Sequence, residues 1–411
     1  MLRTGIQTTF KRAFHASRAV KREAVILSAS RTPIGSFNGA LASLQGPELG
    51  AIAIKDAVAK AGVSVDDVGE AFLGNVVSAN VGQAPARQAI LKAGLPFSVP
   101  CTTVNKVCSS GLKSVMFAAQ SVLLGQQNVT IAGGFESMSN IPYYLPRVRQ
   151  GLGYGHGEVL DGVLKDGLWD ASDDHHMGMC AEACAETYNF TREQQDAFAL
   201  ESYRRAAEAA QAGRFDAEIA PVTIKTRKGE VSVTTDEEWS KVKMDKVPGL
   251  RPAFTKTGTV TAANASSLND GAAAFVVADA EWAASKGLKP LARIRGFGDA
   301  AKAPIEFTTA PALAVPVALK NAGLAQSDVD LWEINEAFSV VSLANNQLLN
   351  LDPSTVNVNG GAVALGHPIG ASGARILVTL LHTLQQQDKS VGVAAICNGG
   401  GGAAALVVER M

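Results

Sequence analysis

Two cysteines stand at positions where a thiol could react. Cys108 lies in VNKVCSSGLK, residues 104–113, a segment that predicts a strand, a sharp turn and a helix start. At a helix N-terminus, free N–H groups and the helix dipole favour a thiolate. The alternative is a buried, inert cysteine, because cysteine is among the most buried residue types. Cys397 ends an apolar run and precedes Asn398 and four glycines, whose N–H groups are free to bind an oxyanion.

A histidine and an asparagine occupy similar turns. His367 stands in NGGAVALGHPIGASG, residues 359–373, where its small neighbours indicate that it does not serve packing. This segment lacks the patterns of a phosphate-binding loop. Asn335, in EINEAF at residues 333–338, follows a predicted strand and could hold a water or a carbonyl group. Cysteine with histidine indicates nucleophilic acyl chemistry, and the second cysteine is a candidate base.

The turns that carry these residues belong to a chain that repeats itself. Ala-Gly pairs begin at 61 and 322, and Asp-Val pairs begin at 67 and 328. Downstream, Ser110-Gly111 matches Ser372-Gly373, and each pair opens a predicted helix, residues 112–124 and 374–384. Apolar strands are then expected at 129–132 and 391–396. Several matches in one order at nearly one offset indicate a duplicated unit.

The alternation of strands and helices predicts mainly parallel sheets, in two copies packed as layers. A first strand is expected at 23–30 and a first helix at 47–61. Residues 138–266 have no partner in the repeat, and they predict an inserted unit, with a helix at 192–213, that supplies a substrate wall. The expected organisation is a presequence at 1–22, an N-terminal half at 23–137 with part of 267–290, the insert at 138–266, and a C-terminal half at 291–411.

Composition narrows the class of protein. The chain has 411 residues, 47% of them hydrophobic and 18% charged, which is typical of globular proteins and not of disordered ones. No run of 18 apolar residues predicts a membrane span. A net charge of −1 does not indicate the excess of basic residues that is typical of nucleic-acid-binding proteins. Five cysteines argue against a disulfide scaffold and for a reducing compartment.

The first 22 residues differ from the rest in charge. They contain six basic residues and no acidic one, with several hydroxyl residues between them. This composition is typical of a mitochondrial transit peptide, with a solvated basic tail as the alternative. We therefore expect a mitochondrial matrix protein. Removal of this segment would leave a net charge of −7.

The segments NKVCSSGLK, NEAF, GHPIGASGAR and CNGGGG, in this order, resemble those of the thiolase family from residue 23 onward. His176-Met177, the turn at 261–266 and Phe307 indicate the short-chain, biosynthetic type. The resemblance implies duplicated βαβ halves in a layered α/β/α/β/α core with an inserted loop domain. It also implies reversible condensation of two acetyl-CoA to acetoacetyl-CoA and CoA through an acetyl-cysteine. A homotetramer, coenzyme A thioesters as substrates, no organic cofactor and a bound potassium ion are implied as well.

The resemblance gives each candidate residue a role. Cys108 would accept the acyl group after deprotonation by His367, and Cys397 would take a methyl proton from the second acetyl-CoA. His367 and a water on Asn335 would hold the enolate oxygen, and the N–H groups of Cys108 and Gly399 would hold the tetrahedral oxyanion. The implied contacts to substrate and CoA are Tyr203, His176, Met177, Lys241, Val242, Lys243, Lys246, Ser266 and Phe338. The implied potassium ligands are Tyr203, Ala262, Ala263, Ala265 and Val363.

Some residues depart from the family or have ordinary explanations. Lys241-Val242-Lys243 stands where the family has an arginine-containing segment, and lysine cannot make a bidentate contact. The alternative for these lysines is a solvated face. Cys180 and Cys184, four residues apart and close to His175 and His176, are more typical of packing than of a metal site.

Three other functions are alternatives to this interpretation. A nucleotide-dependent dehydrogenase needs a glycine fingerprint after the first strand and an acid about 20 residues later, and the sequence lacks both at those places. A catalytically inactive thiolase-like binding protein would be expected to lack Cys108, His367 or Cys397, and the chain has all three. A 3-ketoacyl-CoA thiolase with a preference for longer acyl chains stays open, because the sequence does not determine chain-length preference.

Overall fold

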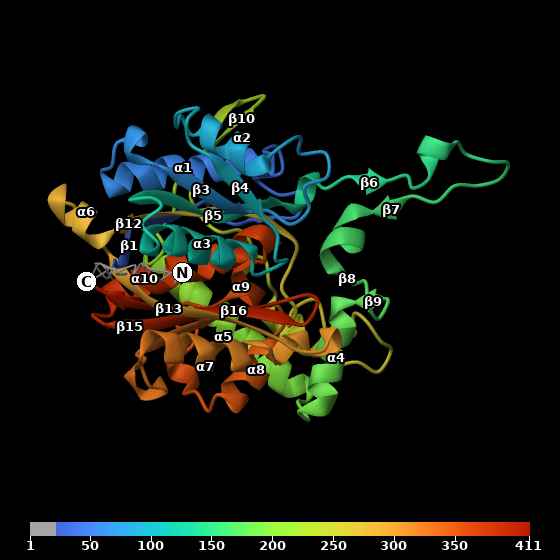
Figure 1. Ribbon diagram of the computed structural model, residues 1–411. Coiled ribbons are helices and arrows are strands. Elements are labelled where there is room, and N and C mark those ends of the chain that lie inside the picture. The colour runs from blue at the N-terminus through green and yellow to red at the C-terminus, as the bar shows by residue number, and fades with distance from the viewer. Residues whose placement is uncertain (1–21) are drawn as a thin grey trace, which may run out of the picture.

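A computed structural model describes residues 22–411, so the expected presequence at 1–22 lies outside the described residues except for Arg22. Five layers, α/β/α/β/α, form the body of the protein (Figure 1). The upper sheet contains β1 (Ala24–Arg31), β12 (Asn269–Asp279), β5 (Val129–Ser137), β3 (Glu70–Gly74) and β4 (Cys101–Val104). The lower sheet contains β13 (Ala292–Ala301), β16 (Gly402–Arg410), β15 (Val391–Asn398) and β14 (Leu331–Ile334). The layered fold expected from the resemblance is confirmed.

Helices cover both sheets and fill the space between them. The outer helices are α1 (Gly46–Ala61) and α2 (Pro85–Lys92) above, and α7 (Pro311–Ala322) and α8 (Ser339–Leu348) below (Figure 1). Between the sheets lie α3 (Ser110–Leu123) and α10 (Ile369–Gln386), which share one apolar core with the inner faces of both sheets. The short helices α6 (Ala280–Ser285) and α9 (Ala362–Leu365) and the two-residue strand β2 (Gly35–Ser36) complete the body. No helix of residues 22–411 is long and apolar enough to cross a membrane.

The two halves repeat one strand order. In the first half, β3 is parallel to β5, and β5, β12 and β1 follow as antiparallel neighbours. In the second half, β14, β15, β16 and β13 have the same order and directions. The repeated Ala-Gly pairs end α1 and α7, with Gly62 and Gly323 in left-handed conformation at φ 68° and 67°. Both are glycine caps of the usual kind, so the duplication predicted from the sequence is confirmed.

The expectation of mainly parallel sheets is wrong. Only β3–β4, β3–β5 and β14–β15 are parallel among the pairs of the two sheets, and the other pairs are antiparallel. The reason lies in the connections. β15 reaches β16 through the turn at 399–401, which is too short for the crossover that a parallel pair requires. The two sheets themselves are joined by β1 and β13 over only two residue pairs, Val25–Arg293 and Ile26–Ala292.

The insert wraps one side of the body. It contains α4 (Met177–Thr187), α5 (Arg192–Gln211), the hairpin β10–β11 (Val222–Thr226 and Gly229–Val233), and the small pairs β6–β7 (Tyr143–Tyr144 and Leu160–Asp161) and β8–β9 (Trp169–Asp170 and His175–His176). A long arm that begins at β6 and returns at β7 stands away from the body (Figure 1). The helix expected at 192–213 is α5. The boundaries 138 and 266 of the inserted unit stay a prediction.

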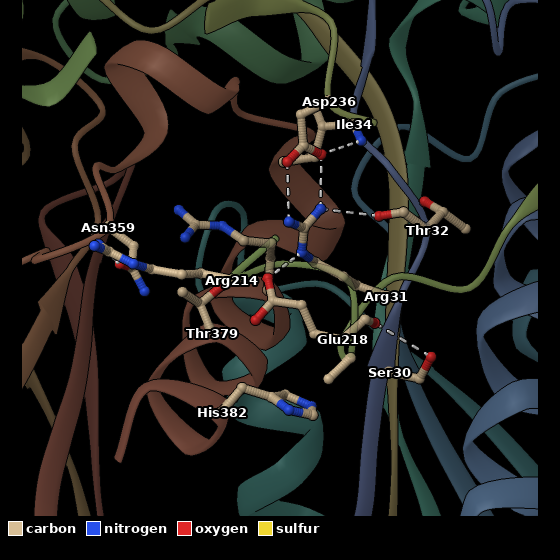
Figure 2. A network of polar contacts seen from close by, with 12 residues as sticks. Ser30, Arg31, Thr32, Ile34, Arg214, Glu218, Asp236, Asn359, Thr379 and His382 are labelled. Atoms are coloured by element: carbon tan, nitrogen blue, oxygen red, sulfur yellow. Dashed lines mark hydrogen bonds and ion pairs between the residues drawn. The ribbon is translucent and has the colours of Figure 1, made fainter. Parts of the chain in front are cut away.

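A buried arginine fastens the insert to the body (Figure 2). Arg31, at the end of β1, is fully buried and contacts Glu218 at 2.6 Å and Asp236 at 2.7 and 2.9 Å. Glu218 also accepts a hydrogen bond from Thr379 of α10 at 3.1 Å. The two carboxylates keep the pKa of Arg31 above its ordinary value despite burial. Removing one partner of such a buried ion pair costs about 3–5 kcal/mol.

Glycines allow the first turns of α3 and α10 to meet against the upper sheet. A Cβ atom on Gly134 of β5 would lie 2.1 Å from the carbonyl oxygen of Gly370. One on Gly74 of β3 would lie 2.7 Å from the amide nitrogen of Gly111. One on Gly373 would lie 2.6 Å from the amide nitrogen of Leu112. Backbone therefore lies directly on backbone where the two central helices begin, and we call these contacts the glycine junction.

The glycine junction predicts a stability effect. Gly134→Ala should destabilise the fold by about 1–3 kcal/mol or more, because the new methyl group meets backbone that cannot rotate away. Urea denaturation followed by circular dichroism measures this. Gly153→Ala is the matched control, since a Cβ there has nothing within 4 Å. Equal stability of both variants would contradict the close packing described here.

Candidate active site

A cavity of about 380 Å³ opens where α3 and α10 begin. Cys108 and His367, the residues just before these helices, both line it, together with Gly399 from the turn after β15. The insert and the segments around it supply the other walls. The remaining lining residues expected from the sequence are His176, Met177, Ala262, Ala265, Ser266, Phe307 and Phe338.

Cys108 is held at a strained turn. Val107 has φ 47°, an unusual conformation for a β-branched residue. Ser109 then occupies the N-cap position of α3, and its hydroxyl donates to Asn398 Oδ1 at 2.8 Å rather than capping the helix. The Cys108 sulfur faces two backbone N–H groups, its own and that of Gly399. Burial nevertheless raises the pKa of Cys108 to about 12, against the lowering effect of these two donors. Desolvation therefore opposes the thiolate that a helix start favours, and deprotonation of this thiol requires a base.

His367 is oriented to serve as that base. Its backbone N–H donates to Asn269 Oδ1 at 2.9 Å, and its Nδ1 lies 2.6 Å from Ser372 Oγ. Because Ser372 donates its own proton to the carbonyl of Pro368, it accepts one from Nδ1–H. Nε2 is then the proton acceptor, and within residues 22–411 it has no hydrogen-bond partner. Burial, and secondarily the charge of Arg375, lowers the pKa of His367 to about 3, so the imidazole is neutral.

Cys397 and Asn335 lie behind the cavity wall. Cys397, in β15, is fully buried and packs with Met177, Phe307 and Phe338. Burial first, and proximity to Cys108 second, raise its pKa well above the ordinary value. Asn335 follows β14 and is 1% exposed, and both polar atoms of its side chain lack a partner among the described residues. A buried amide without a partner is rare, which indicates that it binds something else.

The turn after β15 is shaped by glycine. Gly400 and Gly401 have φ 79° and 86°, which a side chain would strain. This turn brings the Gly399 N–H to the Cys108 sulfur. The two donors expected for an oxyanion therefore lie together.

The residues expected to contact the nucleotide part of CoA lie outside the cavity. Lys241, Lys243 and Lys246 are exposed on the segment after β11, and Val242 packs toward Tyr203 of α5. Lys241 Nζ bonds to Ser36 Oγ and lies 3.5 Å from Glu237. Their contact with CoA stays a prediction.

The residues expected around potassium come from three elements. Tyr203 of α5 and Val363 of α9 share one apolar cluster. The turn at 261–265 is tied to α5 through Asn264, whose amide donates to Asp196 at 2.9 Å. Within residues 22–411, the Tyr203 hydroxyl makes no hydrogen bond and four carbonyl oxygens accept none, those of Ala262, Ala263, Ala265 and Val363. These five oxygen atoms are neutral, and their contact with a cation stays a prediction.

In the insert, a histidine and a cysteine that could suggest a metal site contact each other directly. His175 Nε2 lies 3.2 Å from Cys180 Sγ, and His176 accepts a hydrogen bond from Gly178 at the start of α4. Within the described part of the chain, no group of three or more His, Cys, Asp or Glu side chains could hold a metal ion.

Three residues around the site have contacts that their local sequence does not predict. Ser372 is visible there only as the start of a helix, and its bond to His367 depends on how the chain turns at Pro368. Asn269, which fixes the backbone of His367, is about 100 residues away along the chain. Phe254 stacks on His176 with ring centroids 4.7 Å apart. Nothing in its surrounding sequence separates it from other buried aromatic residues.

Comparison with known proteins identifies relatives over nearly the whole chain. Residues 24–281 match the family described as "Thiolase, N-terminal domain", and residues 288–410 match "Thiolase, C-terminal domain". A Dictyostelium discoideum protein named "Probable acetyl-CoA acetyltransferase" is 55% identical over 407 residues, which cover 99% of this chain and 98% of the relative. A Bos taurus protein named "Acetyl-CoA acetyltransferase, mitochondrial" is 53% identical, over 97% of this chain and 94% of the relative. The crystal structure of Acat5 thiolase from Ascaris suum in complex with coenzyme A has a TM-score of 0.90 and 47% identity, with coverage of 95% and 100%.

The bond between Ser372 and His367 predicts a catalytic effect. Ser372→Ala should lower kcat by about tenfold or more, because Nδ1 loses the partner that sets the tautomer and leaves Nε2 as base. Steady-state assays with acetyl-CoA and acetoacetyl-CoA measure this. Ser342→Ala is the control, since that hydroxyl is fully buried without a partner among the described residues. Unchanged kcat in Ser372→Ala would show that the imidazole does not need this support.

Proposed function

This chain belongs to the thiolase family, and from that premise we propose that it is an acetyl-CoA C-acetyltransferase. It condenses two acetyl-CoA to acetoacetyl-CoA and free CoA, and it catalyses thiolysis in reverse. One observation carries this proposal. A thiol that faces two N–H donors, and a neutral imidazole with a free Nε2, line the same cavity.

The first step transfers an acetyl group to Cys108. His367 Nε2 takes the thiol proton, and the sulfur attacks the thioester carbonyl. The N–H groups of Cys108 and Gly399 bind the oxyanion that forms, and one such donor contributes about 3–4 kcal/mol in other acyl-transfer sites. The CoA thiolate leaves and takes a proton from Cys397. This step ends with an acetylated Cys108, a protonated His367 and a Cys397 thiolate, so charge and protons balance.

The second step forms the carbon–carbon bond. The Cys397 thiolate removes a methyl proton from the second acetyl-CoA, and the burial that raises its pKa makes it a stronger base. His367 and a water on Asn335 hold the enolate oxygen. The enolate attacks the acetyl group, and Cys108 departs with the proton from His367. All three groups thereby return to their starting protonation states.

The acyl end and the nucleotide end of CoA have different surroundings. His176, Met177, Ser266 and Phe338 line the cavity, and we assign them to the chain that leads to the thioester. The exposed Lys241, Lys243 and Lys246 are available to the phosphate groups. Lysine meets phosphate as a point charge, so this contact is less directional than an arginine contact.

The oxygen atoms of Tyr203, Ala262, Ala263, Ala265 and Val363 would hold a potassium ion. Neutral carbonyl oxygens replace the hydration shell of this large ion well. Burial, with Glu238 and Glu336 nearby, raises the pKa of Tyr203 and favours its neutral hydroxyl. When bound, the ion would supply a positive charge that joins α5 of the insert to α9, the helix that ends beside His367.

The arm and the basic segment at 1–22 support our proposals for assembly and location. The arm between β6 and β7 exposes Tyr143, Leu145, Leu152, Tyr154 and Val159, and such a contiguous apolar extension indicates a protein interface. We assign it to a homotetramer built as a dimer of dimers. A matrix location agrees with the basic segment at 1–22 and with relatives named as mitochondrial.

The proposed reaction predicts one acetyl group on Cys108. Brief incubation with acetyl-CoA should label only this thiol, as measured by peptide mass spectrometry. Cys397→Ala should still form the acetyl-enzyme at least partly but lose condensation, because only the second step needs a carbon base. Acetyl on another residue, or a fully active Cys108→Ala protein, would overturn the assignment. Longer acyl-CoA substrates in the same assay test the preference for short chains.

The proposed cation site predicts a response to potassium. Replacement of sodium chloride by potassium chloride at equal ionic strength should raise both kcat/KM and Tm, since a bound ion stabilises the folded state. Tyr203→Phe should weaken both responses. Identical activity and Tm in the two salts would remove potassium from the proposal.

A further inference from the structure

A buried carboxylate that the proposed reaction does not use lies behind the cavity. Glu136, near the end of β5, is 1% exposed. Within residues 22–411 it has no ion pair, although burial of an unpaired carboxylate is costly. It is not among the residues that line the cavity, and the proposed reaction assigns it no step. The cost of burying this carboxylate indicates that it has a specific structural or functional role.

Four N–H donors surround Glu136. Oε1 accepts from Asn75 Nδ2 at 2.8 Å and from the Val77 amide at 3.3 Å. Oε2 accepts from the amides of Val76 at 2.9 Å and Gly370 at 3.0 Å. None of these groups can accept a proton in return. Burial raises the pKa of Glu136, and the four donors act in the opposite direction. Because every partner donates an N–H and none accepts a carboxyl proton, the geometry favours the charged carboxylate.

The contact with Gly370 connects Glu136 to the helix start that carries His367. Gly370 lies in the first turn of α10, where backbone N–H groups have no partner within the helix. A Cβ at this position would lie 2.6 Å from Glu136 Oε2, so the fit is close. Two residues further along, Ser372 holds the imidazole of His367. The carboxylate thus fixes the turn that orients the base.

The same carboxylate reaches the wall around Cys108. Val76 and Val77, whose amides it binds, pack with Met138 and Ile369, and Cys108 packs against this cluster. Glu136 also acts on the Cys108 thiol through charge and contributes to its raised pKa. The titratable groups on the surrounding elements include Cys108 before α3, His367 before α10, Arg375 on α10, Glu70 on β3 and Asp270 on β12.

We propose that Glu136 is a positioning residue for acetyl transfer: its carboxylate anchors the first turn of α10 and the loop after β3, and so places His367 against Cys108. This inference rests on the proposed acetyl transfer. The length and the charge of the side chain both matter. A shorter carboxylate cannot reach the Gly370 amide, and an amide of equal length places its NH₂ group against N–H donors.

Two variants separate the effect of the Glu136 side-chain length from the effect of its charge. Glu136→Asp keeps the charge but loses the reach, and Glu136→Gln keeps the length but loses the charge. Both should lower kcat for thiolysis by about 10- to 100-fold, the cost of a small misplacement of reacting groups. KM for acetoacetyl-CoA should change by less than about twofold, because the cavity lining is intact. Assays are run well below the Tm of each variant.

Alkylation of Cys108 by iodoacetamide gives a second readout. Its pH midpoint, measured on the Cys108 peptide by mass spectrometry, should fall in Glu136→Gln, because the negative charge that opposes the thiolate is gone. It should stay near the wild-type value in Glu136→Asp. This measurement needs no acetyl transfer, so it tests Glu136 even if the proposed function fails.

Asp279→Asn is the matched control. Asp279 is a buried carboxylate that accepts from the Trp282 amide at 2.9 Å at the start of α6. The same chemical change there should leave kcat and the alkylation midpoint unchanged. The proposal is overturned if kcat of both Glu136 variants stays within about twofold of wild type. It is equally overturned if Glu136→Gln leaves the Cys108 midpoint where it was.

Discussion

Contact of backbone with backbone at the glycine junction is the constraint on which the rest of the site depends. Gly74, Gly111, Gly134, Gly370 and Gly373 leave no room for side chains where α3 and α10 begin. Because of this close packing, the two central helices present their first turns to one cavity. Each helix comes from a different half of the chain. Cys108 and His367 immediately precede these turns. The duplication of the fold thus places the proposed nucleophile in one half and the proposed base in the other.

Burial governs the protonation of the site. Desolvation raises the pKa of Cys108 and Cys397 and lowers that of His367, so all three are neutral before substrate arrives. A neutral site avoids the cost of burying isolated charges. Charge then appears only while the thioester reacts, next to N–H donors already in place. Oriented N–H dipoles, rather than charged side chains, are therefore available to stabilise the charge that develops during the reaction.

Buried charge and a short backbone bridge between Arg31 and Ile219 join the insert to the body. Arg31 reaches Glu218 and Asp236 of the insert, and Glu218 reaches Thr379 of α10 (Figure 2). The helix that positions His367 is therefore connected to the segment whose lysines are proposed to meet CoA. Glu136 binds the other side of α10. These two buried acidic contacts hold α10 at its middle and at its start.

Local sequence was sufficient for the elements and for the chemistry. Apolar periodicity and glycine stops predicted α1, α3, α5 and β1 within a few residues, and the repeated Ala-Gly pairs predicted the duplication. Reactive residue types beside glycine-rich turns identified Cys108, His367, Cys397 and Asn335. These features are short-range, because helix caps, turns and alternation depend on neighbours along the chain.

Only the tertiary structure decided which strands pair, how the thiols titrate and what supports the base. The antiparallel pairing of β5 with β12 joins residues about 140 positions apart, and no local pattern encodes it. Burial overrides the effect of a helix start on Cys108, because desolvation depends on everything that covers the sulfur. Asn269, Ser372 and Glu136 act on the turns around His367 through contacts that exist only once the chain has folded. The sequence by itself thus determined which groups could react, and the packed structure determined their protonation and their geometry.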